Sequence, residues 1–68
     1  MISENLQSAI NTQIRNEYYS SYLYLSMSAY CESMNFSGFA GWLRKQSEEE
    51  LAHAMRLLDF LMDMVSRG

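Results

Sequence analysis

Proline is absent from this chain of 68 residues and glycine occurs only three times, so few residues interrupt a helix. Cysteine occurs once, at Cys31, which excludes an internal disulfide and suits a reducing cytoplasm. No apolar run approaches the roughly 18 residues of a membrane span, and the first residues show neither a basic nor an apolar leader segment. We therefore expect a cytoplasmic protein with no membrane partner.

Basic residues are also scarce. Five lysines and arginines stand against eight acidic residues, for a formal net charge of −3, and the basic residues are scattered along the chain. Proteins that bind nucleic acids usually gather basic side chains on one surface, so this distribution argues against a nucleic acid partner. A mildly acidic surface favours cations instead.

The short length is itself a constraint on stability. Residues 1–68 form at most one small domain, and a monomer of this size buries only about 60% of the surface that its unfolded chain exposes. Small domains usually compensate with disulfides, a bound metal or self-association. Because a disulfide is excluded, metal binding or self-association remains.

Periodicity predicts two long helices with a short connection. The first covers about residues 4–32, with Ser3 as its N-cap and Glu4 in its first turn, where a carboxylate interacts favourably with the helix dipole. Turn-forming residues cluster at about 33–35, and the second helix covers about 36–67. Such helices should fold back on each other, so we expect an all-α protein built as an antiparallel two-helix hairpin.

Each predicted helix carries ionisable residues inside an apolar stripe. In the first helix, Glu17 interrupts a stripe formed by Leu6, Ile10, Ile14, Ser21, Tyr24 and Ser28. In the second, Glu50 and His53 interrupt a stripe formed by Phe39, Leu43, Gln46, Leu57, Phe60 or Leu61, and Met64. The first helix also has a flanking stripe of Tyr18, Tyr22, Leu25 and Ala29, which makes its apolar surface too wide for one partner helix.

The turn brings the three ionisable residues together. Folding about Met34 pairs positions whose numbers sum to about 68, which places Glu17 opposite Glu50 and His53. Glu50 and His53 are three residues apart and project from one helix face. A buried carboxylate requires protonation, an ion pair or a metal ion, and one metal ion would account for all three side chains.

One hairpin supplies too few ligands for a complete metal site. If two copies join about a two-fold axis, they contribute four glutamates and two histidines, the ligand set of di-iron carboxylate centres in four-helix bundles. Imidazole and carboxylate ligands suit Fe(II), with Mn(II) or Zn(II) as substitutes. We therefore expect the hairpin to form a homodimeric four-helix bundle with a di-iron centre at its interface.

Residues 14–27 and 39–54 closely resemble the first two helices of bacterial non-haem ferritin. The resemblance implies that Glu17, Glu50 and His53 bind iron at a ferroxidase centre, with Tyr24 beside it as a residue of the surrounding hydrogen-bond network. It also makes Glu49 a candidate ligand of a neighbouring third iron site. The activity it implies is oxidation of Fe(II) by dioxygen or peroxide, followed by storage of ferric mineral in a shell of 24 subunits.

The chain is about half as long as a ferritin subunit, whose remaining helices supply further ligands, so storage in a shell is in question. A self-paired hairpin would resemble bacterioferritin, whose centre is symmetric. The haem-binding methionine of bacterioferritin is replaced by Leu51, so no haem is expected. The alternative function is a structural or engineered ferritin-derived hairpin that self-associates and binds metal without turnover.

Overall fold

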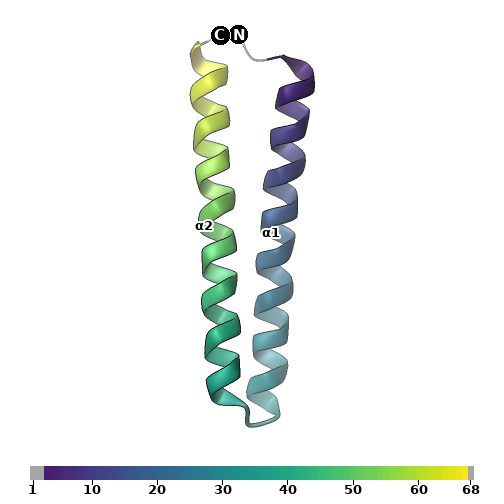
Figure 1. The fold of residues 1–68 in the computed structure, drawn as a ribbon, viewed down its shortest axis with the longest axis vertical. Helices are drawn as coiled ribbons and strands as arrows, with labels where there is room; N and C mark the ends of the chain where they lie inside the picture. The colour runs from purple at the N-terminus through teal and green to yellow at the C-terminus, as the bar shows by residue number, and fades with distance from the viewer. Residues whose placement is uncertain (1–2, 68) are drawn as a thin grey trace.

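The computed structural model of the protein describes residues 3–67 and confirms the predicted all-α hairpin. Helix α1 spans Glu4–Ser33 and helix α2 spans Ser37–Arg67, and the two run antiparallel along their whole lengths (Figure 1). The hairpin is 51 Å long and 16 Å wide. Within the described residues, neither helix has a stretch apolar enough to cross a membrane.

Helix α1 begins at the predicted cap. The Ser3 side chain accepts a hydrogen bond of 3.1 Å from the backbone N–H of Leu6, and Glu4 lies in the first turn. This bond satisfies one of the N–H groups that have no partner within the helix. The carboxylate of Glu4 adds a favourable interaction with the positive end of the helix dipole.

The turn between the helices is a Schellman motif centred on Asn35. Asn35 has a φ of 65°, and its N–H donates to the carbonyl of Glu32 while the N–H of Phe36 donates to the carbonyl of Cys31. Glycine is the usual residue at this left-handed position, and asparagine is a tolerated substitute. The motif ends α1 one residue later than the sequence predicted and starts α2 one residue later.

Small side chains form the contact between the helices and set its register. The hydroxyl of Ser47 donates to the carbonyl of Ser21 at 2.7 Å and lies 2.9 Å from the Ser21 hydroxyl. The Ser47 proton is engaged by that carbonyl, so the Ser21 hydroxyl is the donor between the two side chains. Nearer the turn, Ser28 donates to the carbonyl of Ala40 at 2.7 Å. Each of these residue pairs has numbers that sum to 68, as predicted.

The apolar stripe on α2 matches the prediction in part. Among the described side chains of α2, those of Ala40, Leu43, Ser47, Ala54 and Leu61 are buried, whereas those of Phe39 and Phe60 are exposed. Hydrophobic periodicity gives most weight to large residues, but small ones let two helix backbones approach closely. Leu43 and Leu61 of the predicted stripe are therefore buried in the helix contact, whereas Phe39 and Phe60 lie beside it, on a surface that α1 does not cover.

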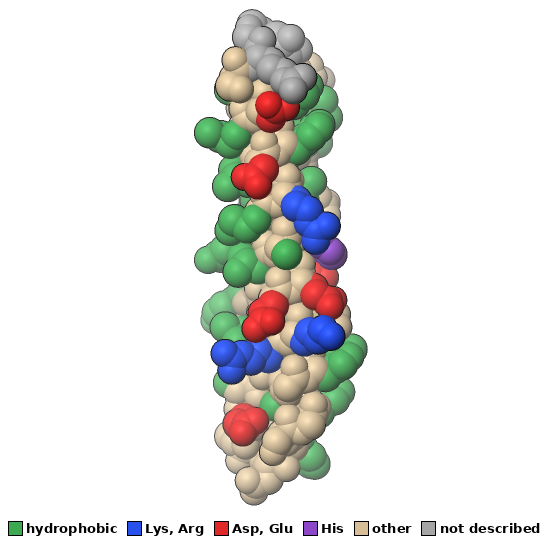
Figure 2. Space-filling model, turned by 90° about the vertical axis from the view of Figure 1, so that its left-hand side faces the viewer, with side chains coloured by type: hydrophobic (Ala, Val, Ile, Leu, Met, Phe, Trp, Pro, Cys, Tyr) green, Lys and Arg blue, Asp and Glu red, His purple; other side chains and the backbone are tan. Residues whose placement is uncertain are grey.

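Large apolar side chains remain exposed on both flanks of the hairpin. Figure 2, which looks onto α2, shows charged side chains along the middle of the helix and hydrophobic side chains gathered mainly along one edge. One flank is a groove lined in part by Tyr18, Tyr22, Leu25 and Leu51. We name the other flank the ligand flank, because it carries His53. It is formed by residues 39, 46, 53 and 60, which recur every seven positions and so lie on one face of α2. Phe39 and Trp42 stack near its turn end, with ring centroids 5.8 Å apart.

Candidate metal centre

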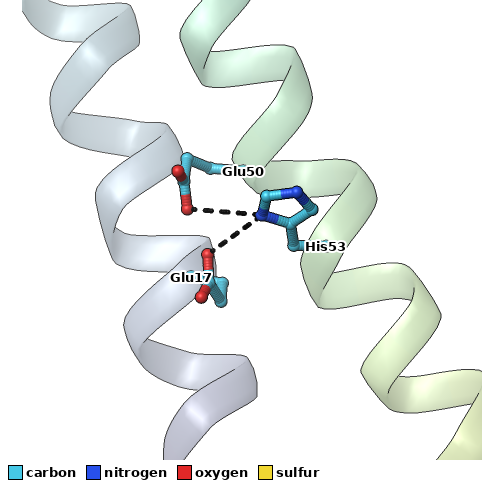
Figure 3. Close-up of side chains that lie close together, drawn as sticks. All are labelled: Glu17, Glu50 and His53. Atoms are coloured by element: carbon cyan, nitrogen blue, oxygen red, sulfur yellow. Dashed lines mark ion pairs between the residues drawn. The ribbon is translucent and has the colours of Figure 1, made fainter.

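Two helices bring Glu17, Glu50 and His53 to one point. Figure 3 shows the Glu17 carboxylate reaching from α1 toward the Glu50 carboxylate and the His53 imidazole on α2. Each residue offers one ligand atom, and these atoms all lie within 4.8 Å of one another. The serine contacts place Glu17 at this level, and the three-residue spacing on α2 aligns the other two side chains.

The distances between these side chains fit a shared ion better than direct hydrogen bonds. Nδ1 of His53 lies 3.6 Å from Oε2 of Glu17 and 3.9 Å from Oε2 of Glu50. Both distances exceed those of good hydrogen bonds. Two ligand atoms that each lie about 2.1 Å from one ion are separated by about 3.0 Å at a right angle and about 3.4 Å at a tetrahedral angle. The two distances to Nδ1 exceed the tetrahedral separation by about 0.2 and 0.5 Å, so small movements would bring the imidazole and each carboxylate to the spacing of ligands on one ion.

The proximity of the two carboxylates shifts their pKa values in opposite directions. Their hydrogen bond raises the pKa of Glu50, and burial together with the nearby charge of Glu17 raises it further. The same hydrogen bond lowers the pKa of Glu17, and a second hydrogen bond from Gln13 adds to this effect. These opposite shifts follow from the repulsion between two neighbouring carboxylates, which a divalent cation bound between them would offset.

The cluster is open on one side. The side chains of Glu17 and Glu50 are 19% and 24% exposed, whereas that of His53 is 49% exposed. The opening lies on the ligand flank. On this flank Phe39 lies seven residues before Gln46, Phe60 lies seven residues after His53, and both phenylalanine side chains are exposed. Three ligand atoms leave coordination positions vacant on a metal that takes four to six, so another group must complete the site.

The other candidates are less directly placed. Tyr24 is half-buried and lies two turns from Glu17 on the same face of α1. Glu49 is exposed, and within residues 3–67 it does not belong to the cluster of ligand atoms, although its charge helps to raise the pKa of Glu50. Their roles remain predictions.

Comparison with known proteins shows the family of the chain. The ferritin-like domain family matches residues 7–64, which include all three clustered residues. The chain belongs to the ferritin family. It is 58% identical over 62 residues to the bacterial non-haem ferritin of Bacteroides fragilis (strain 638R), which covers 91% of this chain and 39% of that protein. It is 35% identical over 63 residues to the bacterial non-haem ferritin of Staphylococcus aureus (strain USA300), covering 93% of this chain and 38% of that protein.

Solved ferritin structures share the hairpin as well. An open pore ferritin from the hyperthermophilic archaeon Archaeoglobus fulgidus matches with a TM-score of 0.88 and 50% identity, over 91% of this chain and 38% of that one. An engineered closed form of the A. fulgidus ferritin gives a TM-score of 0.91 and 48% identity, over 94% of this chain and 39% of that one. The ferritin-family chain described here therefore spans about two fifths of the length of these relatives.

One residue that contacts the cluster was missed by sequence reasoning. The side-chain amide of Gln13 donates a hydrogen bond of 2.8 Å to Oε1 of Glu17. The signal was the spacing of four residues, which places a donor and an acceptor on the same face of a helix. It was not recognised because Gln13 is polar and lies outside the apolar stripe.

Proposed function

We propose that this protein binds Fe(II) at a di-iron carboxylate centre formed where two hairpins join, and that it oxidises the iron to Fe(III) with dioxygen or peroxide. The observation that carries the proposal is the convergence of Glu17, Glu50 and His53 within 4.8 Å of one another at the edge of an exposed apolar flank. The bacterial non-haem ferritins that the chain resembles support iron as the metal.

A second copy would complete both the ligand set and the hydrophobic core. Joining two ligand flanks about a two-fold axis gives two histidines and four glutamates, enough for two ions. The same contact would bury Phe39 and Phe60, which are 57% and 51% exposed in the single hairpin. Burial of apolar area and completion of the metal site therefore favour the same assembly.

The ligand chemistry suits the oxidation of iron. Each Fe(II) ion loses one electron to the oxidant, and the added positive charge is stabilised by carboxylate oxygens. Glu17 and Glu50 supply that negative charge, and carboxylates that bridge two ions would reduce the repulsion between them. His53 presents Nδ1 toward both carboxylates and supplies the nitrogen ligand. Tyr24 is proposed to hydrogen-bond near the site, and Glu49 to contribute a further iron ligand.

An anaerobic Fe(II) titration followed by a pulse of oxygen tests the proposal. We expect about two irons bound for each pair of hairpins, followed by a ferric absorption band that grows on mixing with oxygen. Sedimentation should show dimers or a multiple of them. A stable monomer would contradict the proposed centre, because one hairpin cannot supply its ligands.

Matched variants connect the result to the residues. Glu50→Ala and His53→Ala should abolish stoichiometric binding and fast oxidation. Glu48→Ala removes a neighbouring glutamate whose side chain is 71% exposed, so it should leave both unchanged. Stoichiometric binding of Zn(II) or Mn(II) without Fe(II) oxidation would instead favour the metal-binding module without turnover. The cytoplasmic location rests on the single, free Cys31 and is likewise a proposal.

A further inference from the structure

The two carboxylate oxygens of Glu17 have different surroundings. Oε2 points into the cluster and lies 3.6 Å from Nδ1 of His53. Oε1 accepts a hydrogen bond of 2.8 Å from the side-chain amide of Gln13, one turn earlier on α1. The hydrogen bond therefore distinguishes two oxygens that are chemically equivalent in a free carboxylate.

We propose that Gln13 is a positioning residue that reserves Oε2 of Glu17 for the metal and makes this glutamate a one-oxygen ligand. The inference rests on the proposed metal centre. It assigns to Gln13 a role in setting how many coordination positions the protein occupies on the ion.

The geometry of the hydrogen bond explains the selectivity. A carboxylate binds a cation through one oxygen or through both, and two-oxygen binding requires the carboxylate plane to turn until both oxygens face the ion. Such a turn would take Oε1 away from the Gln13 amide. Side chains four residues apart on a helix are well placed for this contact, so holding the carboxylate requires little distortion of α1.

The consequence is an ion with one more accessible position. Groups that hydrogen-bond to a ligand orient it and affect metal affinity although they do not contact the metal. With Glu17 restricted to one oxygen, a coordination position remains for a carboxylate of the second copy or for the oxidant. Without the restriction, Glu17 could occupy that position itself.

Co(II) binding to the full chain under anaerobic conditions tests this role without relying on iron oxidation. The visible absorption of Co(II) is weaker in six-coordinate sites than in four- or five-coordinate ones, so it reports the number of ligand atoms. Gln13→Met keeps the length and helix propensity of the side chain but removes the amide donor. Gln7→Met is the matched control, because Gln7 is an exposed glutamine on the same helix, in a groove that contains none of the three ligands.

We expect Gln13→Met to bind Co(II) about 10-fold more weakly than the wild type and to show a weaker visible band, while Gln7→Met matches the wild type in both. Unchanged affinity and absorption in Gln13→Met would overturn the inference while leaving the metal centre intact. Weaker binding with an unchanged band would overturn the one-oxygen assignment. Failure of the wild type to bind Co(II) or Fe(II) would refute the proposed centre itself, and the role of Gln13 with it.

Discussion

Replacing Glu50 with glutamine should stabilise the metal-free protein while removing its response to metal. The ligand atoms of Glu17 and Glu50 lie within 4.8 Å of each other. At the upper end of that range, two unit charges repel by about 1 kcal/mol in water and by about 3.5 kcal/mol at an effective dielectric constant of 20. Glutamine keeps the shape of the side chain, carries no charge and can donate a hydrogen bond to Glu17. We therefore expect Glu50→Gln to raise the unfolding free energy by about 1 to 3 kcal/mol at pH 7.5.

The direction of the pH dependence follows from the raised pKa of Glu50. A group whose pKa is higher in the folded state stabilises the fold at low pH, and this stabilisation is lost as the pH rises through the folded-state pKa. The metal-free wild type should therefore lose stability as Glu50 ionises above its usual range. Glutamine does not ionise, so the advantage of the variant should grow from pH 5 to pH 7.5.

Thermal unfolding followed by circular dichroism measures the effect. Samples need a chelator and equal protein concentrations, because self-association would make the midpoint depend on concentration. About 1 kcal/mol corresponds to a shift of roughly 4 to 8 °C for a domain of this size. Saturating Co(II) should raise the midpoint of the wild type far more than that of Glu50→Gln.

The exposed Glu48 provides the control. Glu48→Gln removes a neighbouring charge whose Oε1 lies 3.9 Å from Nε of Arg44. Its effect should stay within about 0.5 kcal/mol. A metal-free Glu50→Gln protein that is less stable than the wild type at pH 7.5, or a difference that does not change with pH, would refute the electrostatic reasoning.

Three further predictions concern the hairpin itself, and all can be measured by urea unfolding. Ser47→Ala should cost about 1 to 2 kcal/mol because it breaks two buried contacts with the opposite helix, whereas Ser26→Ala, at an exposed position, should be neutral or slightly stabilising. Asn35→Gly should preserve or raise stability, whereas Asn35→Ala should cost about 1 kcal/mol, because alanine tolerates the φ of 65° poorly. Equal stability of the two variants would contradict the role given to the turn. Leu43→Ala should cost about 2 to 4 kcal/mol because this side chain is only 4% exposed, and a loss below 1 kcal/mol would mean that the contact near the turn is loosely packed.

The sequence predicted the hairpin because its signals are local. The absence of proline, the cap at Ser3 and the turn residues near Asn35 each act over a few residues, and together they set the helix bounds to within one residue. Paired positions on the two helices have residue numbers that sum to about 68. This rule predicted that Glu17 would lie opposite Glu50 and His53, as the structure shows.

Features that depend on neighbouring backbone were harder to predict. Ser47 is a polar residue among glutamates, and only the close approach of α1 makes it a buried hydrogen-bond partner of Ser21. Phe39 was assigned to the apolar stripe because of its helical spacing, although its side chain is exposed beside the helix contact. The dimer remains a prediction, because it depends on how two copies meet.

The small residues between the helices also determine the width of the candidate site. Ala40, Ser47 and Ala54 are nearly inaccessible to solvent, and they form a narrow spacer between two otherwise bulky helices. Enlarging one of them would separate the helix axes and increase the distance from Glu17 to the ligands on α2. These buried small residues would therefore affect which size of metal ion fits between the ligands, although they do not contact the ion. The spacer is thus a target for changing the metal preference without changing any ligand.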